Sequence, residues 1–545
     1  MSQADPNASR AGGGVDAVVV NARITDGEIW PQEYEAAAIH GGRIAGLGTN
    51  TEVSRTIGSR TRVTDAGGRR VVPGLIDGHL HVVRAGQSYG ITVSWASIRS
   101  IEEGLARLQT AAADLDPGAW LIVLGGWTED QLADGRGPTP AELDASSGGR
   151  PAYVQCAYQY AIVNTEGARI IGLATGDPQV PEVSIVRDES GAPTGRINGL
   201  PAFAAVLDGV IGMPDGNGQM AGTTRFLSGL RRLGLVGAVD AGGFRTKPES
   251  YDAVYELARR QALDFRLRLY VHPGEQGNQV EQTRQWVRHA RPRDGHPYLQ
   301  IIGLGEVVHH DCHDMSGYDS SFSIPQEARR ELAEISQLAA DYGFAMHAHA
   351  IRDESVGATI DAWETITDPS DVARLRFSIA HGELTGRANL ERLARLGAGI
   401  GVQARMYDTG VTAAAAWGDE AYTAAPRLGA IEELGIPLGG GTDGAVGHTY
   451  NPWEALSWFV TGRSVSDAPR RAEGHRLSRE RALAIYTRGS AWFSFEEHER
   501  GGVRVGDLAD LAILSADYFK VPEEEIASIT AWMTIVDGRV VHSTE

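Results

Sequence analysis

The chain has 545 residues, of which 42% are hydrophobic, so it can bury a large core and comprises more than one domain, or one large domain with additions. A formal net charge of −20 disfavours a nucleic-acid partner and an anionic membrane surface. Apolar runs of transmembrane length are absent, and the two cysteines are too few for a disulfide framework. We therefore expect a cytoplasmic protein that binds neither nucleic acid nor membrane.

Both ends of the chain predict short β-strands. Residues 1–14 are polar, rich in Gly, Ala and Ser, and lack a hydrophobic segment, so we expect a disordered tail there and not a signal peptide. Apolar runs follow at 17–24 and 37–47, and similar runs occur at 510–514 and 532–541. Strands this short bury no face alone, so residues 15–70 and 496–545 are expected to form one composite β-domain.

The most informative motif comes next, at residues 71–81, with the sequence VVPGLIDGHLH. An apolar run of strand character ends in two histidines, His79 and His81. Side chains at positions i and i+2 of a strand point to the same face, so both imidazoles point at one spot. Neutral imidazole binds zinc and neighbouring transition metals well, and the motif therefore predicts a metal site. A pair of hydrogen-bonded structural histidines is the alternative.

Residues 71–495 alternate strand-like apolar runs with amphipathic helices. The clearest helix covers 325–342, with apolar residues at helical spacing and Gly343 as its C-cap. Further strands are predicted at 121–125, 236–240, 265–272, 299–306, 343–349, 376–381, 398–403 and 436–443. This alternation predicts an α/β fold with a parallel sheet, and its length fits a (β/α)8 TIM-type barrel with an insertion around 130–234. A doubly wound open sheet is the alternative.

Six residues that commonly bind metals occur at or near the ends of these predicted strands. They are His79, His81, Glu306, His349, His381 and Asp443. Barrel enzymes hold their catalytic groups at the carboxyl ends of the strands. Each residue alone also fits a hydrogen-bonded loop position, but together the six would converge on one mouth of the barrel.

The chain resembles the amidohydrolase superfamily. The motifs that carry this resemblance are the run at 73–81, the later single histidines and Thr442-Asp443. Three further segments are similar to the branch that contains N-substituted formamide deformylases: 123–130, Val163-Asn164 and 349–353. The resemblance spans about residues 18–541 and implies a metal-bearing barrel flanked by a small β-sandwich built from both chain termini.

Carried over by position, the resemblance implies a metal centre with two ions. His79 and His81 would bind a buried first ion, with Asp443 as a ligand and as the catalytic proton shuttle. His349 and His381 would bind the second ion. Zinc is the expected divalent metal, at two ions per chain, and one ion is the alternative.

Glu306 departs from the pattern of many binuclear relatives, which bridge their ions with a carboxylated lysine on the fourth strand. The two lysines of this chain, Lys247 and Lys520, lie elsewhere. Glu306 falls about where the bridging lysine would be, and a glutamate offers two oxygens to two cations. An ordinary acid paired with an arginine is the alternative for this residue.

Further residues are expected around this metal centre. The loop at 309–314, HHDCHD, is expected to bind substrate or to support the ligands. His347 shares a strand face with His349, but the resemblance selects His349 as the ligand. Candidates for the wall of the substrate pocket are Trp127, Gln159, His309, His310, Gln403, Arg405, Tyr407 and Trp453. Arg405 beside Tyr407 hints at an anionic or aromatic substrate. A solvent-facing position or core packing is the alternative for each of the wall candidates.

The ligand set predicts hydrolysis of a C–N bond, in an amide or related small molecule that is not a peptide, by metal-activated hydroxide. A mononuclear deaminase is one alternative, although Arg352 stands where the similar deaminases carry a glutamate. A metal-dependent decarboxylase on the same scaffold is another, because ligands alone do not choose between C–N and C–C cleavage. A non-catalytic scaffold protein is the alternative from a different class. The expected partners are the substrate and further copies of the chain in a homo-oligomer.

Overall fold

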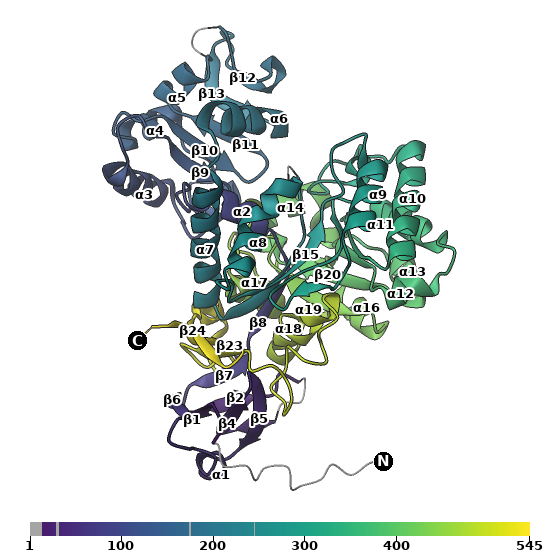
Figure 1. Ribbon diagram of the computed structural model, residues 1–545. Helices are drawn as coiled ribbons and strands as arrows, with labels where there is room; N and C mark the ends of the chain where they lie inside the picture. Colours follow the sequence, from purple (N-terminus) through teal and green to yellow (C-terminus); the bar gives the residue numbers. More distant parts are fainter. Residues whose placement is uncertain (1–13, 29–31, 174–175, 245, 545) are drawn as a thin grey trace.

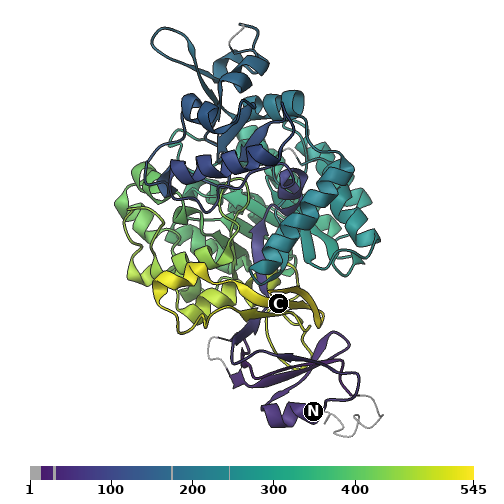
Figure 2. The ribbon, with the colours of Figure 1, turned by 90° about the vertical axis from the view of Figure 1, so that its left-hand side faces the viewer.

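The computed structural model describes residues 14–28, 32–173, 176–244 and 246–544. Three regions follow one another along the molecule: two small sheets built largely from the chain ends, a barrel, and a separate five-stranded sheet (Figures 1 and 2). The barrel and its helices hold the largest buried core. Residues 1–13, on which most of the expected disordered tail falls, lie outside the described residues.

Eight parallel strands form the barrel. In spatial order they are β8 (Leu75–Leu80), β14 (Leu235–Asp240), β15 (Arg266–Val271), β17 (Leu299–Glu306), β18 (Ala345–Ala350), β19 (Ser378–His381), β20 (Gly399–Gln403) and β21 (Leu438–Gly441). Hydrogen bonds link the last strand back to the first: Asp443 N donates to His79 O, and His81 N donates to Gly444 O, at 2.9 and 3.0 Å. A Cβ on Gly441 would lie 2.7 Å from the Cβ of His79, so this approach requires glycine. The predicted parallel barrel is confirmed, and the open sheet is not formed.

Helices surround the barrel on its outside (Figure 2). They are α2 (Val82–Ser88), α7 (Gly216–Arg232), α8 (Asp252–Arg259), α9 (Gln279–His289), α10 (Gln326–Tyr342), α11 (Asp353–Glu364), α12 (Ser370–Arg374), α13 (Arg387–Leu396), α14 (Gly410–Trp417), α15 (Asp419–Ala424), α16 (Leu428–Glu433), α17 (Pro452–Thr461), α18 (Arg479–Ile485) and α19 (Arg488–Phe493). The helix predicted at 325–342 is confirmed as α10, which follows Pro325 and ends at Gly343, a C-cap with a φ of 75°. None of the helices in the described parts of the chain is both long and apolar enough to cross a membrane.

Strands from both ends of the chain pair in one six-stranded sheet. Its order is β24 (Arg539–Ser543), β23 (Ala531–Val536), β22 (Leu511–Leu514), β7 (Arg70–Pro73), β2 (Arg23–Thr25) and β3 (Glu33–Tyr34). A second sheet comprises β5 (Arg43–Gly48), β4 (Ala36–His40), β1 (Ala17–Val20) and β6 (Arg62–Asp65), with helix α1 (Asn50–Ser54) beside it. Residues of both sheets, among them Ile24, Ile39 and Ile513, share one buried core. The boundaries of a composite β-domain at 15–70 and 496–545 stay predictions.

The five-stranded sheet and its helices, residues 101–211, form what we call the insertion, which lies between β8 and β14 in the chain. Its strands, in spatial order, are β12 (Ile185–Arg187), β13 (Pro193–Asn198), β11 (Tyr160–Val163), β10 (Ala152–Cys156) and β9 (Leu121–Leu124). Its α-helices are α3 (Ile101–Asp114), α4 (Pro140–Ser146), α5 (Thr165–Ile170) and α6 (Leu200–Ala204).

One strand lies elsewhere than the sequence suggested. The strand predicted at 121–125 was expected among those of the barrel, but β9 pairs with β10, so the separate sheet begins before residue 130. A short, fully buried apolar run fits a barrel strand and any other buried strand equally well. Only the pairing of the backbone decided between the two sheets.

A buried ion pair ties the barrel to the C-terminal strands. Nε of Arg266, in β15, lies 3.1 Å from a carboxylate oxygen of Asp510, and NH2 of the same guanidinium contacts Asp537. The side chains of Arg266 and Asp510 are each 4% exposed. Burial raises the pKa of Asp510, but the charges of Arg266 and Arg500 outweigh it and hold that pKa below its ordinary value. Loss of the Arg266 charge therefore leaves a carboxylate poorly compensated inside the protein.

Replacing Arg266 by leucine should lower the free energy of unfolding by about 3 kcal/mol, because breaking a buried pair strands its partner. Urea unfolding followed by tryptophan fluorescence measures this loss. Arg387→Leu is the matched control, since the pair of Arg387 with Glu433 is exposed and its loss should lower the free energy of unfolding far less. Equal losses in the two variants would contradict the role given to Arg266.

Candidate metal centre

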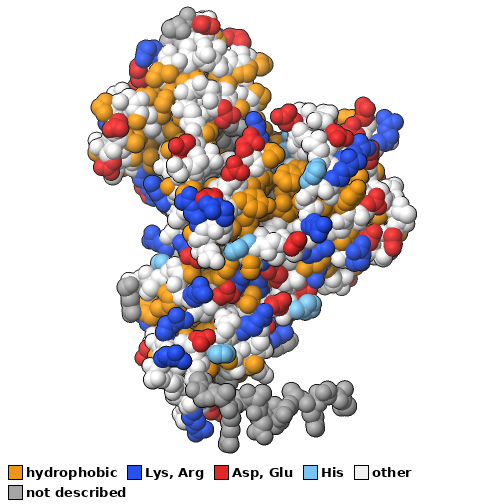
Figure 3. All heavy atoms as spheres, in the orientation of Figure 1, with side chains coloured by type: hydrophobic (Ala, Val, Ile, Leu, Met, Phe, Trp, Pro, Cys, Tyr) orange, Lys and Arg blue, Asp and Glu red, His pale blue; other side chains and the backbone are white. Residues whose placement is uncertain are grey.

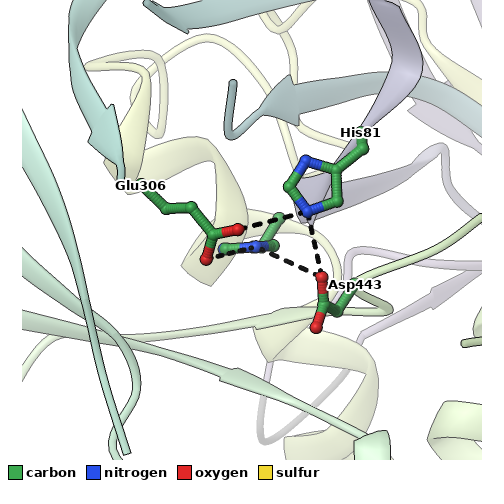
Figure 4. Close-up of side chains that lie close together, drawn as sticks. His81, Glu306 and Asp443 are labelled. Carbon is green, nitrogen blue, oxygen red and sulfur yellow. Dashed lines mark hydrogen bonds and ion pairs between the residues drawn. The ribbon is translucent and has the colours of Figure 1, made fainter. Parts of the chain in front are cut away.

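The six candidate ligands meet at the carboxyl end of the barrel. Each one lies at, or within two residues of, the end of a barrel strand: His79, His81, Glu306, His349, His381 and Asp443. In Figure 4, His81, Glu306 and Asp443 point toward one another from three separate parts of the chain. The Asp443 side chain is 13% exposed, which makes it the least buried of the six.

Four of these side chains form a first cluster, whose ligand atoms all lie within 4.8 Å of one another. Nε2 of His81 is 3.1 Å from Oδ1 of Asp443 and 3.3 Å from Oε1 of Glu306. Nε2 of His79 is 3.6 Å from the same Asp443 oxygen and 3.5 Å from Oε2 of Glu306. Two imidazoles and two carboxylates thus surround a single point.

A second cluster shares one residue with the first. Oε2 of Glu306 lies 3.1 Å from Nδ1 of His349 and 3.1 Å from Nε2 of His381. Glu306 therefore belongs to both clusters, with its two oxygens turned to the histidines of each. Burial raises the pKa of Glu306, but the charge of His79 and the bonds from His349 and His381 outweigh it, and the pKa lies well below its ordinary value.

These residues fit divalent metal ions. Nε2 of His79 is fully buried and has no hydrogen-bond partner among the described residues, and an unpaired buried nitrogen is costly unless something else occupies its lone pair. Imidazole nitrogens combined with carboxylate oxygens are the donor set that zinc and similar transition metals prefer. The geometry therefore supports metal binding at this end of the barrel.

A chain of hydrogen bonds fixes the proton of His79. Ser378 donates to Met346 O at 3.2 Å, so its oxygen accepts from Nδ1 of His347 at 2.8 Å. Nε2 of His347 is then unprotonated and accepts from Nδ1 of His79 at 3.0 Å. Burial lowers the pKa of His347 well below its ordinary value and keeps that ring neutral. The lone pair on Nε2 of His79 therefore faces the cluster, and His347 orients a ligand without being one.

His81 and His349 are oriented in the same manner by neighbouring acceptors. Nδ1 of His81 donates to Gly242 O at 2.8 Å, which leaves its Nε2 lone pair for the cluster. Nε2 of His349 donates to Asp314 at 3.0 Å, which leaves Nδ1 facing Glu306. Asp314 also accepts backbone N–H groups after β18 and is buried, so it is held rigidly. One residue of the histidine-rich loop, Asp314, thus contacts a candidate ligand, and a supporting role for this loop stays a prediction.

Two of the candidate ligands have unusual backbone conformations. His381 and Asp443 have φ values of 79° and 58°, in the left-handed region that residues other than glycine seldom adopt. Such conformations persist only where the surroundings impose them, and they concentrate at functional sites. Here they let the chain turn at the strand end while the side chain stays directed at the cluster.

A cavity of about 1100 Å³ opens beside the clusters, between the barrel and the insertion. Arg84, Phe244 and Val446 line it, close along the chain to His81, Gly242 and Asp443, and so does His310. Arg84 and Phe244 were not among the candidates from the sequence, although the position of Arg84, three residues after a candidate ligand, was a usable signal. We call this space the mouth cavity.

Most of the residues expected in the pocket wall lie elsewhere. Trp127 is fully buried against Trp95 in a core of the insertion, and Gln159 is exposed at a turn between two of its strands. His309 is buried and bonds Glu331 at 2.7 Å. These side chains do not line the mouth cavity. Residue type did not predict this, because tryptophan, glutamine and histidine occur in cores and on surfaces as readily as in pockets.

Arg405 and Tyr407 also lie outside the lining of the mouth cavity, and their contact with a substrate stays a prediction. Nε of Arg405 is 2.9 Å from Glu383, and both side chains are buried, so this guanidinium already has an anionic partner. Tyr407 packs in the barrel core. Gln403 and Trp453 are buried as well and do not line the mouth cavity. The pair therefore gives no evidence about the charge of the substrate.

Replacing Asp314 by asparagine should weaken metal binding about 10- to 100-fold, because the carboxylate that orients His349 is lost. Competition with a chromogenic chelator measures the affinity. Asp311→Asn is the matched control, since Asp311 lies in the same loop but contacts Gln276 and none of the clustered histidines. Unchanged affinity in Asp314→Asn would show that His349 is not a ligand.

Comparison with known proteins agrees with this geometry. Residues 62–542 match the Amidohydrolase family. The chain is 22% identical to an N-substituted formamide deformylase of Arthrobacter pascens, with 96% of this chain and 97% of that protein covered, and 23% identical to the putative amidohydrolase YtcJ of Bacillus subtilis, with 93% and 96% covered. An uncharacterized metal-dependent hydrolase of Pyrococcus horikoshii has a similar structure, with a TM-score of 0.70 at 22% identity over 93% of this chain and 99% of that one. The chain therefore belongs to the Amidohydrolase family and is a hydrolytic enzyme that acts on carbon–nitrogen bonds.

Proposed function

We propose that the protein hydrolyses the C–N bond of a small-molecule amide at a centre of two divalent ions, with zinc as the expected metal. One observation carries the proposal: the Glu306 carboxylate lies within 3.5 Å of imidazole nitrogens in both clusters. A single buried carboxylate between two groups of ligands is the arrangement that bridges two cations. The relationship to the formamide deformylase makes an N-substituted formamide the first substrate to test.

Each ligand has a defined task in this proposal. His79, His81 and Asp443 would hold one ion, His349 and His381 would hold the other, and Glu306 would be available to both. A bound divalent cation lowers the pKa of water and polarises a carbonyl group. Five of the six candidate ligands are buried, all except Asp443, so competing bulk water is largely excluded and electrostatic interactions are strong at this point.

Asp443 is placed to move the proton. Its Oδ1 faces His79 and His81, whereas its Oδ2 lies 4.0 Å from Nε2 of His448. We propose that Oδ2 takes a proton from the attacking water and delivers it to the departing nitrogen, as a general base and then a general acid. The Asp443 side chain is more exposed than those of the other candidate ligands, so it is the one most accessible to a substrate.

The alternatives receive less support. Arg352, three residues after His349, donates to Gly317 O and offers no carboxylate for the proton transfer of a deaminase. A decarboxylase would need no group that delivers a proton to nitrogen, and an assay for released amine separates the two reactions. A non-catalytic scaffold protein would not need six converging ligands. A homo-oligomeric state and a cytoplasmic location remain predictions from the sequence.

Replacing Glu306 by alanine should reduce the metal content from about two ions per chain to one or fewer, because the shared ligand is lost. Inductively coupled plasma mass spectrometry of both proteins measures it. Glu331→Ala is the control, since Glu331 bonds His309 outside both clusters and should keep the metal content of the wild type. One ion in the wild type, unaffected by Glu306→Ala, would favour the mononuclear alternatives.

Replacing Asp443 by asparagine should lower kcat about 10²- to 10⁴-fold while most of the metal stays bound, because the amide cannot carry the proton. Turnover of N-benzylformamide, measured as formate release alongside metal content, tests this. Asp361→Asn, on the exposed face of α11, controls for the chemical change. A turnover near that of the wild type would refute the role of Asp443.

A further inference from the structure

The mouth cavity is much larger than a simple formamide. At about 1100 Å³ it reaches the upper end of the size range of small-molecule pockets. Side chains of the insertion form one wall and those of the barrel form the other. In Figure 3 hydrophobic side chains gather in the hollow between these two regions. A substrate that fills this space carries a sizeable body beyond the amide itself.

The inner wall of the cavity is largely apolar and uncharged. Leu124, Phe203 and Leu207 come from the insertion, and Phe244 comes from the barrel. His272 adds a polar ring, but burial lowers its pKa to about 4, so the ring is neutral near pH 7. This wall suits an aromatic or aliphatic group.

Arg84 is the exception. Among the described residues that line the cavity, it is the only Lys, Arg, Asp or Glu that is not exposed. The other charged lining residues are exposed: Asp208, Lys247, Glu249 and Glu275. A partly buried guanidinium against an apolar wall favours an anion more strongly than an exposed one does.

Arg84 lies directly beside the first metal cluster. Both it and His81 flank Gly243: a Cβ on that glycine would lie 3.2 Å from Nδ1 of His81 and 3.8 Å from NH1 of Arg84. The start of α2 is fixed to the barrel, because Val83 N donates to Asp240 at 2.7 Å. The backbone that carries Arg84 is therefore fixed, and its guanidinium lies near His81, on the Nδ1 side of that ring.

The guanidinium retains capacity for a ligand. Within the described residues, its side-chain hydrogen bond is from NH1 to the Tyr158 hydroxyl, at 2.8 Å, and no carboxylate pairs with it. A guanidinium has five N–H donors in a planar fork that matches a carboxylate. Arg405, by contrast, forms an ion pair with Glu383.

We propose that Arg84 binds a carboxylate of the substrate, and so selects amides that bear an anionic group near the scissile bond and an apolar body. This inference rests on the proposed amide hydrolysis. The amide faces the metal centre, the carboxylate meets Arg84 next to His81, and the apolar body lies against Phe203 and Phe244. Arg84 is thus a residue that determines specificity and not one that performs the chemistry.

Two formamides that differ only in the carboxylate test the proposal. N-formylphenylalanine, as both enantiomers, has the anion, and N-(2-phenylethyl)formamide lacks it. Hydrolysis of either compound consumes one water and releases formate and an amine. The wild type should favour the anionic compound about 10- to 100-fold in kcat/KM, and Arg84→Gln should abolish that ratio, mainly through KM, because a charge-assisted hydrogen bond is lost. An unchanged ratio in Arg84→Gln, or no preference in the wild type, overturns the inference and leaves the proposed function standing.

Tyr158→Phe separates recognition from a purely structural role. This variant removes the hydrogen bond between the insertion and Arg84 but keeps the guanidinium, so the preference for the anionic compound should persist. If Tyr158→Phe loses the preference as fully as Arg84→Gln does, the arginine acts by joining the two regions and the proposal is wrong.

A binding measurement distinguishes failure of the inference from failure of the proposed function. 3-Phenylpropionate carries a carboxylate and no amide, so titration calorimetry with the metal-loaded protein does not depend on turnover. Arg84→Gln should weaken its binding about 10-fold or more. If neither formamide is hydrolysed but this loss is seen, the carboxylate site stands and amide hydrolysis fails. If the affinity is unchanged, the carboxylate site is refuted.

Discussion

One buried carboxylate organises this molecule. Glu306 lies within 3.5 Å of four imidazole rings that come from the ends of three other barrel strands. No local segment could bring these groups together, since they come from positions between residues 79 and 381 of the chain. The barrel does so because its parallel strands all end at one mouth. Closure of the ring, with Gly441 against His79, is therefore a condition for the site.

A second layer of the structure keeps these rings directed at that carboxylate. His347, the carbonyl of Gly242 and Asp314 each accept a hydrogen bond from one nitrogen of His79, His81 and His349 respectively, so the opposite nitrogen of each ring faces the Glu306 carboxylate. Gathering so many polar groups inside a protein is costly, and the left-handed backbone at His381 adds strain. The free energy gained by burying the extensive apolar core around the barrel offsets these costs.

Chemistry and selectivity are separated in space. The candidate ligands come from the ends of barrel strands, which the closed ring holds fixed, whereas the wall of the mouth cavity is shared with the insertion. Loops and insertions at a barrel mouth change without disturbing the strands, so one reaction can serve many substrates. Arg84 lies at the boundary between the barrel and the insertion. It belongs to α2, which directly follows the candidate ligand His81, and its guanidinium contacts Tyr158 of the insertion.

The sequence by itself determined the alternation of strands and helices, α10 with its Gly343 cap, and the six candidate ligands, because periodicity and strand-end position are local properties. Glu306 was found because a carboxylate stood at the end of a strand where a lysine was missing. Tertiary structure alone decided that β9 joins the insertion, that Arg405 pairs with Glu383, and that Arg84 lines the cavity. Those outcomes depend on which distant segment is the neighbour, and one sequence contains no record of its long-range contacts.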